Sequence, residues 1–448
     1  MIRYTLREIA QRTGGSLLQG TDPEKEIHGV GTDTRTHLSG RLFVALRGPR
    51  FDGHDFVEAA RKAGAAAVLV QRPSPGPGVL VADPLAALQV LAAAWRRELG
   101  TSLAAVTGSC GKTTVKEILA AMLRQSGPCL ATRGNLNNHI GVPLTLAELG
   151  PEHRHAVVEM GMNHAGEIAV LTRMARPDLA LINNAGPAHI ENLGSIAAIA
   201  AAKGEILEGL SAHGIAVING DDEYADYWAE RAPGEVWRFS LDDRPARVRG
   251  QWRPQGKGGV LDLRAPQGNV SLRIPLSGRH NGANVLAATT AALALNLGLD
   301  QIASAVEALT PAPGRLQWRE GKGGSRILDD TYNANPASVE AALRVLAEQP
   351  GRRYLVLGDM AELGADAELH HQQMGGHARA LGIDGVFTLG SLSRTTSRAF
   401  GPAGTHFVER EALVDAVLSM LAPDAVVLVK GSRAAHMERV VAALTEAS

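Results

Sequence analysis

The stretch AVTGSCGKTTVKE, at residues 105–117, combines glycines, a lysine and threonines in a spacing suited to phosphate chemistry. Its glycines let backbone N–H groups crowd around phosphate oxygens, its lysine adds a cation, and a threonine hydroxyl suits Mg²⁺. The spacing departs from the general phosphate-loop pattern, because Val106 stands where that pattern has a glycine. The residues expected at the phosphates are Gly108, Ser109, Cys110, Gly111, Lys112, Thr113 and Thr114.

Two further polar residues lie at or beyond apolar runs in the same region. Glu159 ends the run VVEMG, and His189 lies in the Gly- and Pro-bounded loop NNAGPAHIENLG. Carboxylate and hydroxyl oxygens are the donors that Mg²⁺ prefers. Taken singly, His189 is more often a loop histidine with satisfied hydrogen bonds, and Glu159 a solvated carboxylate at a strand end. Their occurrence together, in the same predicted domain as the phosphate loop, favours a metal site.

Lys203 is the least expected member of this group. In SIAAIAAAKGEIL, at residues 195–207, a helix would place Lys203 on the apolar face formed by Ile196, Ile199 and Ile206, with no carboxylate one turn away. An isolated lysine would extend to water along that face. A lysine that is buried instead tends to lose its proton, which leaves a neutral amine.

Polar residues recur at the starts of helices and the ends of strands further along the chain. LSGRHNGANVLAA opens a helical pattern with His280, Asn281 and Asn284, whose amides suit a purine edge; helix capping by Asn281 is the alternative. Arg315 lies in PGRLQ at an expected domain boundary. Asp330 follows Asp329 at the end of a strand-like run, where it would bond ribose hydroxyls or cap the next helix.

The elements that must position these residues alternate in type. From residue 101 the apolar runs SLAAVTG, HAVVEMG, LALINNAG and GIAVING are separated by helical patterns, and SRILDDTY, RYLVLGDM, GVFTLG and AVVLVKGS repeat this beyond the loop TPAPGRL. Such alternation indicates βαβ units around parallel sheets, with ligands at the carboxyl ends of strands. We predict an α/β protein of three domains: a small α/β domain at 1–98, a central parallel sheet with helices on both faces at 99–311, and a Rossmann-like α/β domain at 312–448.

Composition restricts the partners. The 448 residues include 45% hydrophobic and 20% charged residues, which is typical of globular chains of about three domains. A net charge of -1 argues against non-specific electrostatic binding to nucleic acid or to an anionic membrane. The N-terminus lacks a signal-peptide core, the run NVLAATTAALALNLGL reads as a buried helix, and the two cysteines fit a reducing compartment. We expect a cytoplasmic monomer.

These motifs together resemble the Mur ligases of bacterial cell-wall synthesis. The resemblance is carried by TGSCGKTTVKE, VEMGMNHAGEI, NNAGPAHIENLGSIAAIAAAKGEI, LSGRHNGANVLAA and PGRLQ, and it extends to the N-terminus through GVGTDTRTHLSGRLFVALRGPRFDGHDF, which is similar to a UDP-binding domain. Within the family, DDTYNANP, GDMAELG and VKGSR most resemble the members that add D-alanyl-D-alanine to UDP-N-acetylmuramoyl-tripeptide.

The resemblance implies a mechanism. ATP phosphorylates the free carboxylate of the tripeptide, the amine of the dipeptide attacks the acyl phosphate, and phosphate leaves as the amide forms. Two Mg²⁺ ions and Lys112 would shield the charge of the transferring phosphoryl group. The third domain, which shares the ATP contacts, would close over the nucleotide and bind the incoming dipeptide.

Residue roles also follow from the resemblance. Thr113 and Glu159 would hold one Mg²⁺, His189 would help to hold the second, and Lys203 would be carbamylated. The expected ATP contacts beyond the phosphate loop are Asn281, Asn284, Arg315 and Asp330. The expected substrate contacts are Thr34, Arg35, Asp52 and His54 near the UDP moiety, and Asn137, Asn138, His139, Tyr332, Asn333 and Asn335 near the peptide.

Three alternatives remain open at this stage. The Mur ligase that adds the third stem-peptide amino acid shares the phosphate-loop and metal motifs, but its DNPR-like signature is absent from the C-terminal region of this sequence. A folylpolyglutamate or cyanophycin type of ligase leaves the N-terminal TDTR segment unexplained. A P-loop regulator or motor would hydrolyse ATP without forming an amide.

Overall fold

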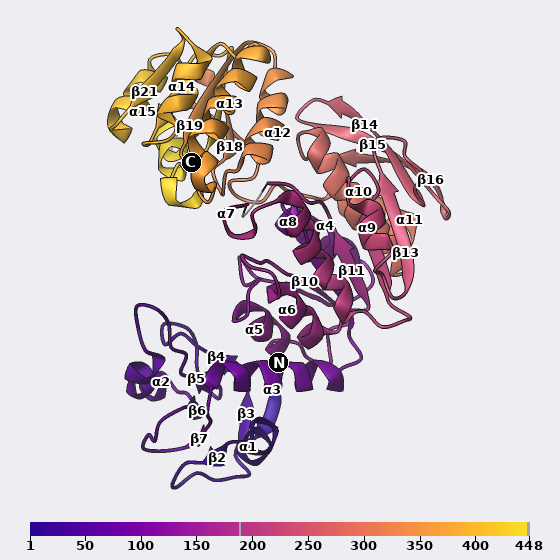
Figure 1. The fold of residues 1–448 in the computed structure, drawn as a ribbon, viewed down its shortest axis with the longest axis vertical. Coiled ribbons are helices and arrows are strands. Elements are labelled where there is room, and N and C mark those ends of the chain that lie inside the picture. The colour runs from indigo at the N-terminus through magenta and orange to yellow at the C-terminus, as the bar shows by residue number, and fades with distance from the viewer. Residues whose placement is uncertain (188–189, 446–448) are drawn as a thin grey trace.

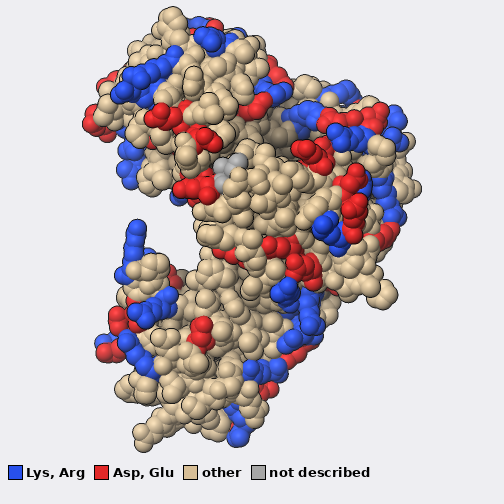
Figure 2. All heavy atoms as spheres, in the orientation of Figure 1, with Lys and Arg blue, Asp and Glu red and all other residues tan. Residues whose placement is uncertain are grey.

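The computed structural model describes residues 1–187 and 190–445. Three α/β bodies follow one another along the chain, with the N-terminal body at the bottom of Figure 1, the central one in the middle and the C-terminal one at the top. Figure 2 shows a notch between the N-terminal and C-terminal bodies, and basic and acidic side chains interspersed over the visible face. The predicted α/β class with three domains is confirmed.

The N-terminal body is built on a small, mostly parallel sheet in the order β2-β7-β6-β5-β4, beside an antiparallel pair of β1 and β3. Its last helix, α3, begins where the Asp83 carboxylate accepts from two backbone N–H groups and Pro84 takes the first helical position. The elements are β1 (Arg3–Thr5), α1 (Leu6–Thr13), β2 (Ser16–Leu17), β3 (Glu26–His28), β4 (Val30–Gly31), β5 (Leu42–Val44), η1 (Gly53–Phe56), α2 (Val57–Lys62), β6 (Ala67–Val70), β7 (Gly78–Leu80) and α3 (Pro84–Glu98).

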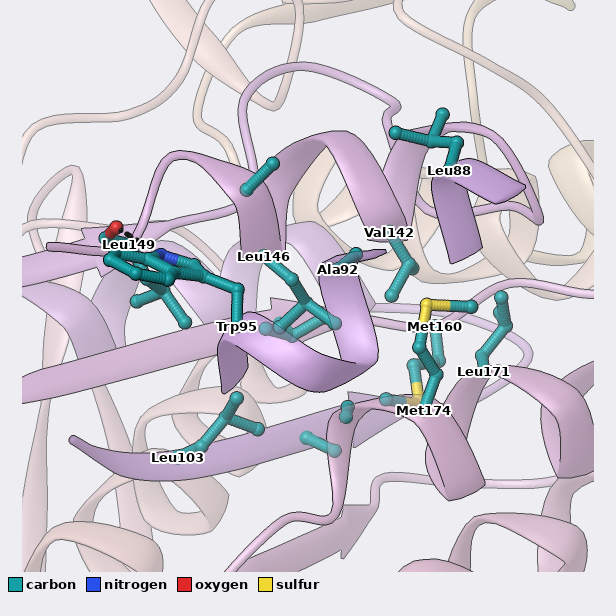
Figure 3. Close-up of a cluster of buried hydrophobic side chains, with 14 of the residues drawn as sticks. Leu88, Ala92, Trp95, Leu103, Val142, Leu146, Leu149, Met160, Leu171 and Met174 are labelled. Carbon is teal, nitrogen blue, oxygen red and sulfur yellow. Dashed lines mark hydrogen bonds between the residues drawn. The ribbon is translucent and has the colours of Figure 1, made fainter. Parts of the chain in front are cut away.

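Helix α3 packs against the central body as well as against the N-terminal body to which it belongs. Trp95 of α3 donates from Nε1 to the Leu149 carbonyl at 2.8 Å, and α3 lies against Leu146 and Met174 of the central body (Figure 3). Buried apolar residues of the first two bodies therefore form one continuous core, with α3 packed between them.

The central sheet runs in the order β16-β15-β14-β13-β12-β11-β8-β10-β9, parallel from β9 to β14 and antiparallel from β14 to β16. Apolar cores on its two faces confirm helices on both sides. Residues 284–294 of the run NVLAATTAALALNLGL belong to a buried helix, as predicted, and that helix ends at Ala294. The elements are β8 (Ser102–Thr107), α4 (Lys112–Leu123), β9 (Cys129–Ala131), α5 (Gly141–Ala147), β10 (His155–Glu159), α6 (Glu167–Ala175), β11 (Leu179–Ile182), α7 (Ile190–Leu193), α8 (Ile196–Gly204), η2 (Glu205–Gly209), β12 (Ile215–Asn219), α9 (Ala225–Ala229), β13 (Glu235–Ser240), β14 (Val248–Gln255), β15 (Gly258–Ala265), β16 (Gly268–Ile274), α10 (Arg279–Ala294) and α11 (Leu299–Glu307).

The C-terminal sheet runs in the order β17-β18-β22-β19-β20-β21 and is parallel except for β17. Apolar cores again cover both faces, as in a doubly wound fold. The elements are β17 (Gln317–Glu320), η3 (Lys322–Gly324), β18 (Arg326–Asp330), α12 (Pro336–Ala347), β19 (Arg352–Gly358), η4 (Gly364–Asp366), α13 (Ala367–Ala380), β20 (Gly385–Leu389), α14 (Arg394–Phe400), β21 (Gly404–Phe407), α15 (Arg410–Leu418), β22 (Ala425–Lys430), η5 (Arg433–Ala435) and α16 (Glu438–Leu444).

The connection between the second and third bodies is a tight turn around the predicted boundary. Gly314 has a φ of 67° and Leu316 a φ of 48°, and the indole Nε1 of Trp318 donates to the Ser277 hydroxyl at 2.9 Å. This turn brings the carboxyl ends of the central strands to face those of β18 and β22. Every helix within the described ranges is too short or too polar to span a bilayer.

Candidate active site

The phosphate loop lies between β8 and α4, as the sequence predicts. Gly111 adopts a φ of 80°, and a Cβ atom there would lie 2.4 Å from the Asn284 Oδ1, so both conformation and space require glycine. The Lys112 ammonium folds back and donates to the Gly108 carbonyl at 2.7 Å. The backbone N–H groups at the start of α4 therefore surround a concave site with a lysine at its rim.

A cavity of about 1050 Å³ extends from this loop to the C-terminal body. It brings together residues that are distant in the sequence and that were predicted to bind ATP, metal or peptide. Those that line it are Ser109, Cys110, Gly111, Lys112, Thr113, Thr114, Asn137, Glu159, Asn281, Asn284, Arg315, Asp330, Tyr332, Asn333 and Asn335.

Glu159 ends β10 and is almost fully buried at the floor of this cavity. Its Oε1 accepts from the Asn137 side-chain amide at 2.8 Å. Its Oε2 is buried and has no hydrogen-bond partner among the described residues. An unsatisfied oxygen on a carboxylate that lines the same cavity as the phosphate loop fits a hard cation. Within the described chain, groups of three or more His, Cys, Asp or Glu side chains suited to a metal are absent, and His189 lies outside the described residues.

Lys203 is only 2% exposed on α8 and does not reach solvent along the helix face. Burial lowers the pKa of its ammonium well below the ordinary value, and the nearby positive charge of Lys112 lowers it further. The Lys203 amine therefore holds its proton less tightly than the amine of an exposed lysine does.

Two asparagines that were not among the predicted site residues, Asn183 and Asn184, support the phosphate loop. The Asn184 Oδ1 accepts from the Cys110 N–H at 2.9 Å, and the Asn183 side-chain amide donates to the Cys110 carbonyl at 3.0 Å. The Ser109 N–H also donates to the Asn184 carbonyl at 3.0 Å. Their position in the sequence could have indicated this role, because the two asparagines directly follow the apolar run of β11.

Asn281 and Asn284 form part of the same network. Asn281 donates to the Ser277 carbonyl at 2.8 Å and accepts from Asn284 at 3.1 Å, while the Asn284 Oδ1 accepts from Asn183 at 3.0 Å. The alternative that Asn281 caps α10 is wrong, because Gly278 holds the N-cap position. The neighbouring His280 also lines the cavity, and burial together with the charge of Lys430 lowers its pKa to about 4.

In the C-terminal body, Asp330 forms an ion pair with the buried Lys430 that the sequence did not reveal. The Lys430 Nζ, at the end of β22, lies 2.5 Å from the Asp330 Oδ2 and donates to the Asn333 carbonyl at 2.9 Å. Burial raises the pKa of the Asp330 carboxyl, and Lys430 opposes this shift. The alternative that Asp330 caps the next helix is wrong, because Asn335 caps α12.

Two contacts pre-position other residues of this body. The Arg315 guanidinium lies 4.1 Å from the centre of the Tyr332 ring, in cation–π geometry. Asn335 approaches the Cys110 sulfur at 3.4 Å, so the start of α12 touches the phosphate loop. The two bodies thus share one site.

The remaining predicted residues lie outside this cavity and make local contacts. The Asp52 carboxylate caps η1 and lies 2.6 Å from the His54 Nδ1, and the His54 Nε2 accepts from the Gln71 N–H at 3.0 Å. Arg35 pairs with Asp33, next to Thr34. The Asn138 side chain accepts from the Gly141 N–H at 2.9 Å, and the His139 carbonyl accepts from Gln89 at 3.0 Å.

Comparison with known proteins covers nearly the whole chain. The Mur ligase middle domain matches residues 106–292, the glutamate ligase domain of Mur ligases matches 314–433, and the catalytic domain of the Mur ligase family matches 26–108. The UDP-N-acetylmuramoyl-tripeptide–D-alanyl-D-alanine ligase of Escherichia coli is 44% identical over 452 residues, which cover 100% of this chain and 99% of that one.

Solved structures agree with this assignment. MurF from Acinetobacter baumannii is 34% identical with a TM-score of 0.93, covering 99% of this chain and 98% of that one. MurF ligase from Thermotoga maritima, in complex with ADP, is 29% identical with a TM-score of 0.84, covering 93% and 96%. A diaminopimelate-adding ligase is 19% identical with a TM-score of 0.56, covering 96% and 93%, and shows the shared fold alone. The resemblance is confirmed: the chain belongs to the Mur ligase family.

Proposed function

We propose that this chain is an ATP-dependent ligase that joins D-alanyl-D-alanine to UDP-N-acetylmuramoyl-tripeptide in peptidoglycan synthesis. The observation that carries the proposal is the 44% identity, over the full length of both chains, to a relative with that name. The cavity between the phosphate loop and the C-terminal strands supports it, because a ligase must hold nucleotide, carboxylate and amine together.

The chemistry explains why ATP is needed. A carboxylate is a poor electrophile until one oxygen becomes a leaving group. Transfer of the γ-phosphoryl group of ATP to the tripeptide carboxylate gives an acyl phosphate and ADP. The neutral amine of the dipeptide then attacks the acyl carbon, the C–O bond to phosphate breaks, and the amide forms as one amine proton passes to the departing phosphate. Lys112 and the backbone N–H groups at the start of α4 would stabilise the charge on the transferring group.

Thr113 and Glu159 would hold one Mg²⁺, with His189 and a carbamylated Lys203 supporting a second. Mg²⁺ would neutralise negative charge on the phosphates during transfer. The buried, unsatisfied Oε2 of Glu159 supports this assignment within the described chain. Carbamylation would join the neutral Lys203 amine to CO₂ with release of a proton, and its support is the burial of that lysine beside Lys112.

The remaining roles extend this proposal to whole domains. Residues 1–98 would bind the UDP moiety through Thr34, Arg35, Asp52 and His54, and 99–311 would bind ATP. Residues 312–448 would contribute Arg315 and Asp330 to ATP and would bind the dipeptide. Asn137, Asn138 and His139, with Tyr332, Asn333 and Asn335, would contact the peptide parts. We further propose that the enzyme works in the cytoplasm as a monomer.

The acceptor test separates the two nearest ligase activities. With ATP, Mg²⁺ and UDP-N-acetylmuramoyl-tripeptide, we expect phosphate release with D-alanyl-D-alanine to exceed that with diaminopimelate by about 100-fold or more, because the site must match the amine it uses. Mass spectrometry of the product should show the pentapeptide. Activity that required diaminopimelate and UDP-N-acetylmuramoyl-dipeptide would contradict the proposal. Phosphate release without any acceptor would instead indicate a simple ATPase.

Domain closure is a second expected result. The proposed ATP contacts are divided between the central body and Arg315 and Asp330 beyond the turn at Gly314, so nucleotide should draw the two bodies together. Small-angle scattering should give a smaller radius of gyration with a non-hydrolysable ATP analogue and tripeptide precursor than without them. An unchanged radius at saturating ligand would exclude closure.

A further inference from the structure

Lys116 is a lysine without exposed surface on the helix that carries the phosphate loop. It is 0% exposed, whereas the side chain of the adjacent Glu117 is 49% exposed and lines the cavity. The Lys116 Nζ lies 2.6 Å from the Glu117 Oε1 and donates to the Thr132 carbonyl, also at 2.6 Å. Lys116 therefore lies beneath the residues that line the cavity and does not contact a ligand bound there.

Thr132 transmits this contact to the strand that carries Glu159. It follows β9, is 1% exposed, and its N–H donates to the Val157 carbonyl at 3.0 Å. Its hydroxyl accepts from the Glu159 N–H at 2.9 Å. The carbonyl of Thr132 is thus held by Lys116, and its hydroxyl holds the backbone of Glu159.

This chain of contacts connects the two sides of the proposed metal site. The first turn of α4 carries Thr113, and Lys116 lies one turn further along the same helix. At the other end, Glu159 terminates β10 with one oxygen held by Asn137 and the other unsatisfied among the described residues. The link from Lys116 through Thr132 therefore ties the threonine side of the site to the carboxylate side.

Stability alone does not account for a cation at this position. Taking an ammonium group out of water is costly, and an apolar side chain of similar length often fills such a space at no loss of stability. A buried charge that is bound by a carbonyl and a carboxylate does fix geometry more sharply than apolar packing does.

We propose that Lys116 is a positioning residue that sets the placement of the Glu159 carboxylate relative to the Thr113 hydroxyl, and thereby the affinity for ATP with Mg²⁺. This inference rests on the proposed function, since it assumes that the cavity binds ATP with its metal. Groups that orient a metal ligand typically change metal affinity by 10- to 100-fold when they are removed.

The test measures equilibrium binding of ATP by calorimetry, with Mg²⁺ and with EDTA, for the full-length chain. Lys116→Met keeps length and burial but removes the charge. We expect the tightening of ATP binding by Mg²⁺ to fall by about 10-fold or more, while binding in EDTA changes less than about twofold. Lys116→Arg, which keeps a buried donor, should recover part of the effect of Mg²⁺.

A matched control is Arg96→Met. Arg96 is also a buried cation that donates to backbone carbonyls, at Ala175 and Leu99, but it lies away from the cavity. This variant should lower the melting temperature and leave the effect of Mg²⁺ unchanged.

Three outcomes would overturn the inference. One is a Lys116→Met variant that melts at a lower temperature yet keeps the full effect of Mg²⁺, because Lys116 would then be structural only. If that variant fails to fold, Thr132→Val decides: it removes the hydroxyl that holds Glu159 and should lose the same effect, so full retention would refute the link. Failure of the wild type to bind ATP would refute the proposed function itself, and with it this inference.

Discussion

Lys203→Ala is expected to lower kcat by about 100- to 1,000-fold while the protein remains folded, because it removes a group that would stabilise charge at the phosphoryl transfer. Lys203 is fully enclosed near Lys112, and a carbamate there would replace a second cation with an anion that supports the metal. Phosphate release with tripeptide and D-alanyl-D-alanine measures the loss, and circular dichroism checks the fold.

The carbamate itself can be separated from other roles of the lysine. Wild-type activity should fall in CO₂-depleted buffer and return with bicarbonate, whereas Lys203→Ala should respond to neither. Small carboxylic acids should partly restore the variant, because they supply the missing anion. Wild-type activity that is independent of bicarbonate would count against carbamylation.

Burial of Lys203 should make the free energy of unfolding depend on pH. A lysine whose pKa in the folded protein is lowered binds its proton more weakly there than in the unfolded chain. Without CO₂, the free energy of unfolding should therefore rise with pH between the lowered value and the ordinary value of 10.5. Lys203→Ala should flatten that slope.

Lys430→Met is expected to destabilise the C-terminal body by about 1–3 kcal/mol, because it leaves the partly buried Asp330 carboxylate without its cation. It also removes the donor that holds the Asn333 carbonyl, so the loop with Tyr332 should loosen. Thermal unfolding followed by calorimetry measures the loss, and ATP affinity should fall with it.

The double variant Asp330→Asn with Lys430→Met provides the control. An uncharged amide needs no cation, so most of the lost stability should return while ATP binding stays weak. The loss in Lys430→Met should also shrink as the pH falls, because burial raises the pKa of Asp330 and the unpaired carboxyl can take up a proton. A loss that is independent of pH and is not recovered in the double variant would show that the ion pair is not its cause.

Local sequence pattern predicted the parts of the site that depend on few neighbours. The strand, glycine turn and helix start around residues 108–114 were predicted correctly because they follow one another directly in the chain. Glu159 was placed correctly at a strand end for the same reason. Lys203 was singled out because one cation in an apolar helix face conflicts with helical periodicity.

Contacts between distant segments escaped prediction. Lys430 meets Asp330 only because β22 inserts beside β18 in the sheet, 100 residues apart in the chain. Asn183 and Asn184 support the phosphate loop because β11 neighbours β8. The sequence pattern alone could not decide whether Asn281 faces a purine or caps a helix. Its hydrogen bonds to Ser277 and Asn284 depend on how α10 packs.

By itself, the sequence determined the α/β class, the three bodies and the strand, turn and helix at residues 105–117, because these follow from periodicity and from short motifs. Its longer motifs carried the resemblance to a ligase family. Only the tertiary structure decided which polar groups are buried, which of them are paired, and which carboxylate oxygen is left unsatisfied. The physical reason is that desolvation and hydrogen bonding depend on every neighbour in space. Lys116 illustrates this: it reads as an ordinary helical lysine until packing places its ammonium group on the Thr132 carbonyl behind Glu159.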